Sequence, residues 1–364
     1  MRKRFEDVLD IINGKNQKKV ENPNGVYPIY GSGGVMGYAD DYLCEANTVV
    51  IGRKGSINNP IYVEEPFWNV DTAFGLTARK DMLLPRYLYF FCVHYDFCKL
   101  NTTVTIPSLT KANLLKIEMD VPDLDEQKKI VDKLDSVVKL IWLQKEQIKQ
   151  LDTLIKARFV EMFGDPEENP FGWEKAQLSN VILNANNGMA RRGNDEDGNI
   201  VIRLVELQDG YIDYSNSNRI ILKDNEKKRY LLKDKDFLFA RVNGNPDNVG
   251  RCAVFHDIGE DVYHNDHIIR VHFDEKMLNG TYASALLNSD YGKRQLKGQI
   301  KTSAGQYTVS QDGIGAIVTT LPPIELQEQF AAFVRQVDKS KFAVQKALDK
   351  TQLLFDSLMQ KYFG

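Results

Sequence analysis

One segment of the chain occurs twice, and this repeat limits the possible folds more than any other feature of the sequence. The first copy begins at Pro122 and ends with Phe163-Gly164, and the second begins at Pro322 and ends with Phe363-Gly364. The two copies align without a gap. An internal repeat of this kind indicates a duplicated structural unit.

Both copies have the pattern of a long amphipathic helix. Apolar residues recur at steps of three, four and seven at Ile130, Leu134, Val137, Ile141, Ile148, Leu151 and Ile155, and again at Phe333, Val337, Val344, Ala347, Leu354 and Leu358. These steps place the residues on one stripe of a helix. Neither copy contains Pro or Gly between its opening prolines and its closing Gly. Each copy therefore predicts one helix of about 38 residues, roughly 57 Å long.

The apolar stripes must be buried, and each helix offers the other a matching surface. Residues 165–321 join the end of the first helix to the start of the second. An antiparallel pair brings those two points together, whereas a parallel pair would force a compact domain to span the whole helix. We predict an α+β fold with two α/β domains, separated by two long helices that pair as an antiparallel coiled coil with pseudo-two-fold symmetry. The alternative is that the helices form the core of an ordinary bundle.

Composition places few limits on the partners of the chain. The 364 residues include 47 Lys and Arg and 50 Asp and Glu, so any contact with nucleic acid must come from local basic patches. The four cysteines form no Cys-x-x-Cys pair, and no run approaches the roughly 20 apolar residues of a membrane span. We expect a cytoplasmic protein with reduced thiols and no membrane partner.

The two globular parts, residues 1–121 and 169–321, have similar layouts. Asp236-Phe237-Leu238-Phe239-Ala240-Arg241-Val242-Asn243-Gly244 matches Thr48-Val49-Val50-Ile51-Gly52-Arg53-Lys54-Gly55 with one inserted residue, and His264-Asn265-Asp266 parallels Asn69-Val70-Asp71. Short helices are predicted near residues 5–8 and 178–181, a longer one over residues 88–99, and a strand over residues 114–121. The helices are similar in the two copies while the globular parts differ.

Motifs for catalysis are missing from the sequence. No Gly-x4-Gly-Lys-Ser/Thr loop occurs, and no Asn- or Asp-Pro-Pro-aromatic motif of an amino-group methyltransferase. Gly31, Gly33 and Gly34 form either a plain turn or a phosphate loop, and the turn is favoured because no helix pattern follows. His264 with His267 favours polar packing over metal binding. We predict no catalytic site, no metal site and no cofactor.

The order of these parts resembles the specificity subunit of Type I restriction-modification systems. The resemblance covers essentially the whole chain and depends on the Pro-x-Leu/Ile-x-x-Gln motifs at residues 122–127 and 322–327, the strand-Arg turns at Arg53 and Arg241, and the Phe-Gly pairs that end both repeats. It implies two target-recognition domains, residues 1–121 and 169–321, and two spacer helices, residues 122–168 and 322–364.

The resemblance also implies a function. A non-catalytic subunit of this kind binds double-stranded DNA, and each recognition domain reads one half of a bipartite asymmetric target while the helices set the gap. Two modification (methyltransferase) subunits dock on the helices, and restriction (translocase-nuclease) subunits join the complex. S-adenosylmethionine, ATP and Mg then belong to those partners.

Basic and turn residues are the candidates for DNA contact. A Gly next to Arg lets the backbone approach phosphate, and Arg can bind guanine through two hydrogen bonds. The candidates are Arg53, Lys54, Arg191, Arg192, Arg241, Asn243, Lys293, Arg294, Lys297 and Lys301. The alternatives are that the arginines pair with nearby carboxylates and that the lysines cover a solvated helix face.

Four apolar residues near the helix ends are the candidates for subunit docking: Phe159, Phe163, Met359 and Phe363. The alternative is that these side chains pack in the protein core. Two other functions stay open for the whole chain, a two-headed coiled-coil adaptor and a specificity module of another multi-subunit DNA modification system. Sequence-dependent DNA binding that weakens steeply with salt separates the adaptor from the DNA-binding proteins.

Overall fold

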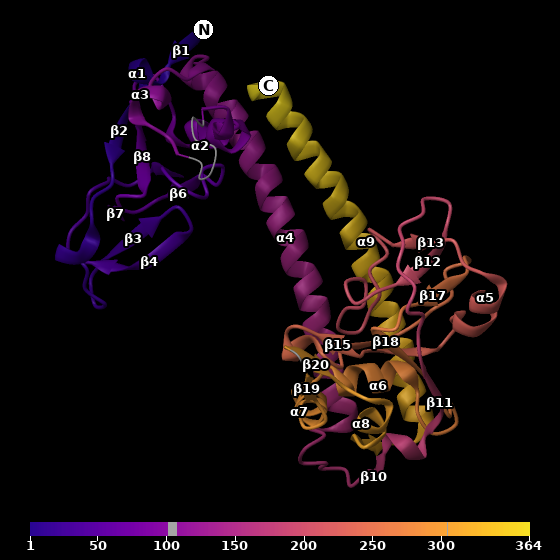
Figure 1. Cartoon of the computed structure of the whole chain (residues 1–364). Helices are drawn as coiled ribbons and strands as arrows, with labels where there is room; N and C mark the ends of the chain where they lie inside the picture. Colours follow the sequence, from indigo (N-terminus) through magenta and orange to yellow (C-terminus); the bar gives the residue numbers. More distant parts are fainter. Residues whose placement is uncertain (101–107, 304) are drawn as a thin grey trace. The chain divides into compact units, whose positions relative to one another are not determined.

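The computed structural model describes residues 1–100, 108–303 and 305–364, and it divides into two compact units (Figure 1). Unit 1 comprises Met1–Glu146 and Val344–Gly364, and unit 2 comprises Gln147–Ala343. Each unit therefore contains one β-rich domain and half of each long helix.

The two repeats form the long helices α4 (Leu124–Phe163) and α9 (Ile324–Phe363). In unit 2, Phe163 near the end of α4 contacts Phe330 near the start of α9, with ring centroids 5.5 Å apart. In unit 1, Leu134 in the first half of α4 shares a core with Leu358 in the last turns of α9. The helices are paired antiparallel, as predicted.

Burial along the predicted stripe is uneven. Leu134 and Val137 on α4 and Leu358 on α9 are buried in the core of unit 1, and Val337 on α9 is also buried. The α9 stripe differs from the prediction, because Leu354 is 49% exposed while Leu348 and Thr351 are buried instead. Ala347 is also exposed. The domains thus bury the helix ends, so helix periodicity alone misplaces part of the apolar face.

The first domain is built mostly of short strands with few helices. Its elements are β1 (Arg2–Arg4), α1 (Phe5–Val8), β2 (Leu9–Asn13), η1 (Gln17–Lys19), β3 (Tyr27–Gly31), β4 (Gly34–Ala39), β5 (Thr48–Gly52), β6 (Ile61–Val63), β7 (Trp68–Asn69), β8 (Ala73–Ala78), α2 (Pro85–His94), η2 (Phe97–Leu100), α3 (Lys111–Leu114) and β9 (Glu118–Asp120). The β-branched strand β5 is buried along its whole length, because it lies between β8 and β6.

The second domain has the same plan with insertions. Its elements are β10 (Glu174–Gln177), η3 (Leu178–Asn180), β11 (Ile182–Asn187), β12 (Asn199–Ile202), β13 (Arg219–Ile220), α5 (Asp224–Tyr230), β14 (Phe237–Ala240), β15 (Val242–Asn243), η4 (Pro246–Asn248), β16 (Cys252–Val254), β17 (Val262–His264), β18 (Ile268–Phe273), α6 (Gly280–Leu287), α7 (Asp290–Lys297), β19 (Lys301–Ser303), β20 (Gln306–Thr308), α8 (Gln311–Gly315) and β21 (Val318–Leu321).

The sheets of the two domains correspond strand by strand. The order β2-β8-β5-β6 in the first domain corresponds to β11-β18-β14-β16 in the second, and β4-β3-β7 corresponds to β13-β12-β17. One parallel pair, β3 with β7 and β12 with β17, occurs in both. The predicted match of the domains therefore extends to their topology, although their side chains have diverged.

The glutamine of each Pro-x-Leu/Ile-x-x-Gln motif fixes a long helix to its domain. Gln127 is fully buried; its amide nitrogen donates to the carbonyls of Met82 and Pro122, and its oxygen accepts from the N–H of Leu84 at 2.8 Å. Gln327 makes the same bonds, donating to Met277 and Pro322 and accepting from Asn279. These bonds make α2 and α6 equivalent in the two domains, with Leu84 corresponding to Asn279.

Two local predictions were wrong in their bounds. The helix expected over residues 88–99 is α2, which begins at Pro85 and ends at His94, because Pro fits the first turn of a helix. The strand expected over residues 114–121 is limited to β9, since Leu114 ends the short helix α3. No helix within the described residues has both the length and the apolar character needed to cross a membrane.

Candidate nucleic-acid interface

The turn that follows the central strand of each domain is held by the same backbone hydrogen bonds. In the first domain, the N–H of Arg53 donates to the carbonyl of Thr72 at 2.8 Å, and the carbonyl of Arg53 accepts from Leu109 at 2.9 Å. In the second domain, Arg241 donates to His267 at 2.7 Å and accepts from Val309 at 2.9 Å. Arg53 and Arg241 are therefore structurally equivalent, as the sequence match indicates.

A glycine brings a second segment onto this turn in both domains. A Cβ atom on Gly14 would lie 1.7 Å from the carbonyl oxygen of Val70, and one on Gly188 would lie 2.2 Å from that of Asn265. Only Gly allows this approach. The next residue then bonds to the same loop, because the N–H of Lys15 donates to Asn69 at 2.9 Å. Met189 makes the equivalent bond to His264 at 3.0 Å.

This equivalence reveals basic residues that the sequence analysis missed. Lys15, Lys18 and Lys19 follow Gly14 in the first domain, as Arg191 and Arg192 follow Gly188 in the second. The three lysines are exposed and form no ion pairs among the described residues. Basic residues within five positions of a Gly in both domains were a signal, but neither Gly lies in a recognisable motif.

The glycine turn between β3 and β4 lies beside the Arg53 turn. A Cβ atom on Gly52 would approach the Cβ of Ser32 to 2.9 Å, which places the two turns in contact. Gly34 has a φ of +112°, a conformation that L side chains rarely adopt. A strand rather than a helix follows this turn, so it has the form of a hairpin and lacks the helix N-terminus of a phosphate loop.

Within the described residues, the arginines at these turns form no ion pair with a carboxylate. Arg53 is exposed, its guanidinium lies 5.8 Å from the Phe74 ring centroid, and no ion pair forms with it within the described part of the chain. Arg241 donates to the backbone carbonyl of Asp266 at 3.3 Å. The alternative of carboxylate pairing is therefore not found for either arginine in the described residues. Lys54 is exposed beside Arg53.

Charged and polar side chains of the second domain gather around Arg241. Arg192 forms an ion pair with Asp266 at 2.6 Å and lies 3.2 Å from Nε2 of His267. Burial lowers the pKa of His267; the carboxylate of Asp266 opposes this shift, and the cations Arg192 and Arg241 add to it. Asn243 accepts a hydrogen bond from the N–H of Asn245, which fixes the turn.

The predicted basic cluster near α7 divides into two groups. Lys301 is exposed on the three-stranded sheet β15-β20-β19, which also carries Asn243, and it lies opposite Thr308. Lys293 pairs with Asp209 at 2.7 Å and Lys297 with Asp247 at 2.7 Å. Arg294 pairs with Glu167, and Arg191 pairs with Glu226. These four cations already have carboxylate partners, so they add less positive field than the sequence suggests.

The residues predicted for subunit docking pack within the units. Phe159 and Phe163 are 5% and 2% exposed, and the rings of both contact those of Tyr282 and Phe330. Met359 is buried, and Phe363 is half-buried against Tyr87 with ring centroids 5.1 Å apart. The alternative of core packing therefore fits Phe159, Phe163 and Met359, because each contacts aromatic or apolar groups far away in the sequence.

His264 behaves as a buried core residue. It is fully buried, its Nδ1 lies 3.2 Å from the carbonyl oxygen of Tyr230, and burial lowers its pKa to about 4. In the described residues no group of three or more His, Cys, Asp or Glu side chains is arranged to hold a metal ion. Three of the four cysteines are buried, and burial raises the pKa of Cys44 to about 12.

These residues form two similar surface regions, one in each domain, which we call edges. Each combines an arginine that forms no ion pair with the residues that the structure describes, a close-packed glycine and a following segment with basic residues. Such groups bind phosphate through N–H donors and read guanine through paired hydrogen bonds. We name them the Arg53 edge (Gly14 to Lys19, Ser32 to Gly34, Arg53, Lys54) and the Arg241 edge (Gly188 to Arg192, Arg241 to Asn243, His267, Lys301).

Known proteins match both the sequence and the fold. The family model of the Type I restriction modification DNA specificity domain matches residues 1–153. The Type I restriction enzyme StySPI specificity subunit of Salmonella potsdam is 25% identical over 86% of this chain and 72% of its own. The EcoKI specificity subunit of Escherichia coli strain K12 is 23% identical, with the same coverage of both chains. The solved structure of a Type I S subunit from M. genitalium shares the fold, with a TM-score of 0.64, 16% identity and coverage of 100% of this chain and 96% of that one.

The two curated relatives match 86% of this chain, and the M. genitalium structure matches its whole length. Residues 1–153 match the Type I restriction modification DNA specificity domain, and the chain as a whole is similar to the specificity subunits of Type I restriction-modification systems.

Proposed function

We propose that each β-rich domain reads one half of a bipartite, asymmetric target in double-stranded DNA. The observation that carries this proposal is that equivalent backbone hydrogen bonds hold Arg53 and Arg241, while the side chains beside the two arginines differ. Thr72 in one domain corresponds to His267 in the other, and Lys15 corresponds to Met189. A common frame with divergent side chains supports recognition of two different half-sites.

In this proposal the four parts of the chain divide the work. Residues 1–121 and 169–321 are the target-recognition domains, and residues 122–168 and 322–364 are the spacer helices that set the gap. Gln127 and Gln327 support this division, because they fix a helix rigidly to each domain. A rigid connection is what a spacer needs.

The helices also dock two methyltransferase subunits, and restriction subunits join that complex. S-adenosylmethionine, ATP and Mg are bound by those partners, and the complex works in the cytoplasm, where host DNA lies. Exposed apolar side chains on the helices, among them Trp142 (60% exposed) and Phe342 (72% exposed), support a docking role. Large exposed apolar groups are typical of protein interfaces. The docking role of Phe159, Phe163, Met359 and Phe363, near the helix ends, stays a prediction, with core packing as the alternative.

Binding-site selection tests the DNA reading. The complex of this chain with its methyltransferase subunits is incubated with random duplexes, and bound sequences are read. We expect two defined half-sites with a fixed unspecified gap, and methylated adenines in both. Arg53→Ala should relax one half and Arg241→Ala the other. Binding of equal strength to all sequences would exclude the proposal, and so would both variants relaxing the same half.

A further inference from the structure

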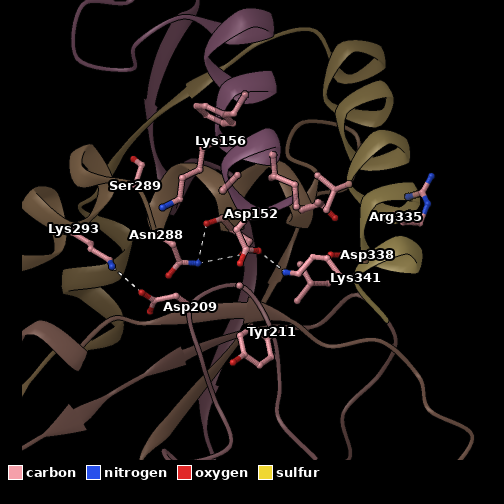
Figure 2. Close-up of a pocket in the computed structure, with 18 of the residues that line it drawn as sticks. Asp152, Lys156, Asp209, Tyr211, Asn288, Ser289, Lys293, Arg335, Asp338 and Lys341 are labelled. Carbon is pink, nitrogen blue, oxygen red and sulfur yellow. Dashed lines mark hydrogen bonds and ion pairs between the residues drawn. The ribbon is translucent and has the colours of Figure 1, made fainter. Parts of the chain in front are cut away.

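Unit 2 contains a cleft of about 910 Å³ whose walls are the C-terminal half of α4, the N-terminal half of α9, helix α6 and residues 209–214 (Figure 2). Its apolar lining includes Ile155, Phe159, Ala285 and Val334. The described residues that line it include no member of the Arg241 edge. We call it the unit 2 cleft.

The corresponding positions in unit 1 carry larger side chains. Because Gln127 binds the N–H of Leu84 and Gln327 binds that of Asn279, helices α2 and α6 share a register. The same argument applies to the strands, since Val49 pairs with Tyr62 and its equivalent Phe237 pairs with Val254. The side chains Tyr62, Arg86, Tyr89 and Phe90 in unit 1 thus correspond to Val254, Thr281, Ser284 and Ala285 in unit 2, and all four of the latter line the cleft.

In unit 1 these larger side chains fill the space. The guanidinium of Arg86 lies 4.9 Å from the ring centroids of Tyr62 and Tyr89 and 5.1 Å from that of Phe90. It also pairs with Asp135 on α4 at 2.7 Å. In unit 2 the helix residue equivalent to Asp135 is Arg335, so neither the cation nor its partner is kept. Substitution of large side chains by small ones therefore creates the cleft.

Charges around the cleft are nearly balanced. Its lining includes five Asp and five Lys or Arg residues, and Lys341 pairs with Asp152 while Lys293 pairs with Asp209. Lys156 is exposed and forms no ion pair among the residues that the structure describes (Figure 2). A lining with equal numbers of positive and negative side chains does not attract the phosphate backbone of DNA, which requires excess positive charge. A lining that combines apolar side chains with charges of both signs instead suits a polypeptide, and Lys156 can pair with a carboxylate of that polypeptide.

We propose that the unit 2 cleft binds a polypeptide segment of one methyltransferase subunit, whose apolar side chains contact the apolar lining and whose carboxylate pairs with Lys156, so that the two docking positions on this chain are unequal. The inference rests on the proposed docking of methyltransferase subunits on α4 and α9. Its support is that both helices line the cleft and that the equivalent space in unit 1 is filled. One subunit then gains contacts that the other lacks.

The test fills the cleft with the residues of unit 1. A variant carrying Val254→Tyr and Ala285→Phe is purified and mixed with methyltransferase subunits, and native mass spectrometry counts the bound copies. We expect the wild-type chain to bind two copies, and the variant to bind one with unchanged affinity and the other at least about 10-fold more weakly. Melting temperature shows whether the variant folds. A chain with Val205→Tyr and Ile221→Phe, at exposed positions away from the cleft, is the matched control.

A second variant keeps the test valid if filling the cleft impairs folding. Lys156→Glu changes an exposed side chain and should weaken the same copy about 10-fold through charge repulsion. Unchanged binding of both copies by folded variants overturns the inference, and so does an equal loss of both copies or a loss of DNA binding alone. If the wild-type chain binds no methyltransferase, the proposed docking function itself fails.

Discussion

Arg53 and Arg241 occupy equivalent backbone positions, but their side chains contact different groups. Both are held by the same pair of backbone hydrogen bonds, but Arg53 lies near Phe74 while Arg241 donates to the carbonyl of Asp266. An Arg that reads a base contributes sequence preference, whereas one that holds phosphate contributes only affinity. The two roles give different results on substitution.

Exchanging Arg241 for Ala should cost about 1 to 3 kcal/mol of binding free energy at one half of the target and relax the preference there. Competition between the selected sequence and variants of each half-site measures this. Lys301→Ala serves as the comparison, since a phosphate contact should weaken all sequences alike. Equal weakening for Arg241→Ala would assign it to phosphate, and no change would remove it from the interface.

His264 predicts a dependence of stability on pH. Its pKa is about 4 in the folded chain against 6.5 for a free side chain, so the unfolded chain binds the proton more readily. The stabilisation is present above pH 6.5 and is lost as the pH falls towards 4.

Asn occupies the equivalent position, Asn69, in the first domain. His264→Asn should therefore flatten the loss of unfolding free energy between pH 7 and 4 by up to about 3 kcal/mol. Chemical denaturation at a series of pH values measures it. Parallel curves for the two proteins would contradict the assignment.

At the scale of elements, the buried glutamines connect helix and domain. Gln127 satisfies the Leu84 N–H and the Met82 and Pro122 carbonyls, so a side chain of the same length without an amide leaves buried polar groups without partners. Gln127→Met should lower the unfolding free energy by about 2 to 5 kcal/mol. Gln150→Met, on an exposed position of the same helix, is the control. A loss below about 0.5 kcal/mol would show that these bonds contribute little.

Substitutions at Phe163 and Val160 distinguish a role in core packing from a role in docking. Phe163 is 2% exposed against Tyr282 and Phe330, so Phe163→Ser should destabilise the chain by about 3 to 5 kcal/mol. Val160, one turn away, is 55% exposed and lines the unit 2 cleft. Val160→Ser should leave the melting temperature nearly unchanged and reduce co-purification with methyltransferase. The reverse pattern would assign docking to Phe163.

The long helices and the match of the two domains could be predicted from the sequence, because periodicity and repetition are local signals. The Arg53 and Arg241 turns follow from the same match. The position of Lys15 on the loop of Asn69 and Val70 could not be predicted, since it depends on the close approach of Gly14 to Val70, which only the folded backbone reveals. Phe159 was ambiguous for a similar reason. Its partner Tyr282 is more than a hundred residues away, and helix periodicity carries no information about it.

For the whole molecule, the proposed spacer function predicts that helix length controls the gap. Deleting the matched heptads Lys139 to Lys145 and Lys339 to Gln345 keeps the apolar stripe nearly in phase. The selected gap should shorten by about three base pairs, because seven residues correspond to roughly 10 Å of helix. The half-sites should stay the same, since no edge residue is removed. Selection from duplexes with randomised gaps measures this, and a folded variant that keeps the original gap would show that the helices do not set it.

Unit 1 is assembled from two distant stretches of the chain, and this has a consequence for biosynthesis. Its core includes Leu358 and Met359 of α9 together with Phe90 and Leu134, which the ribosome adds more than two hundred residues earlier. Unit 2 is continuous in sequence, so it holds all of its residues before α9 is finished. The domain that is translated first should therefore be the last to complete its core. Until then its apolar surface is open to chaperones and proteases, and translation that stops within α9 should yield a chain with one folded half.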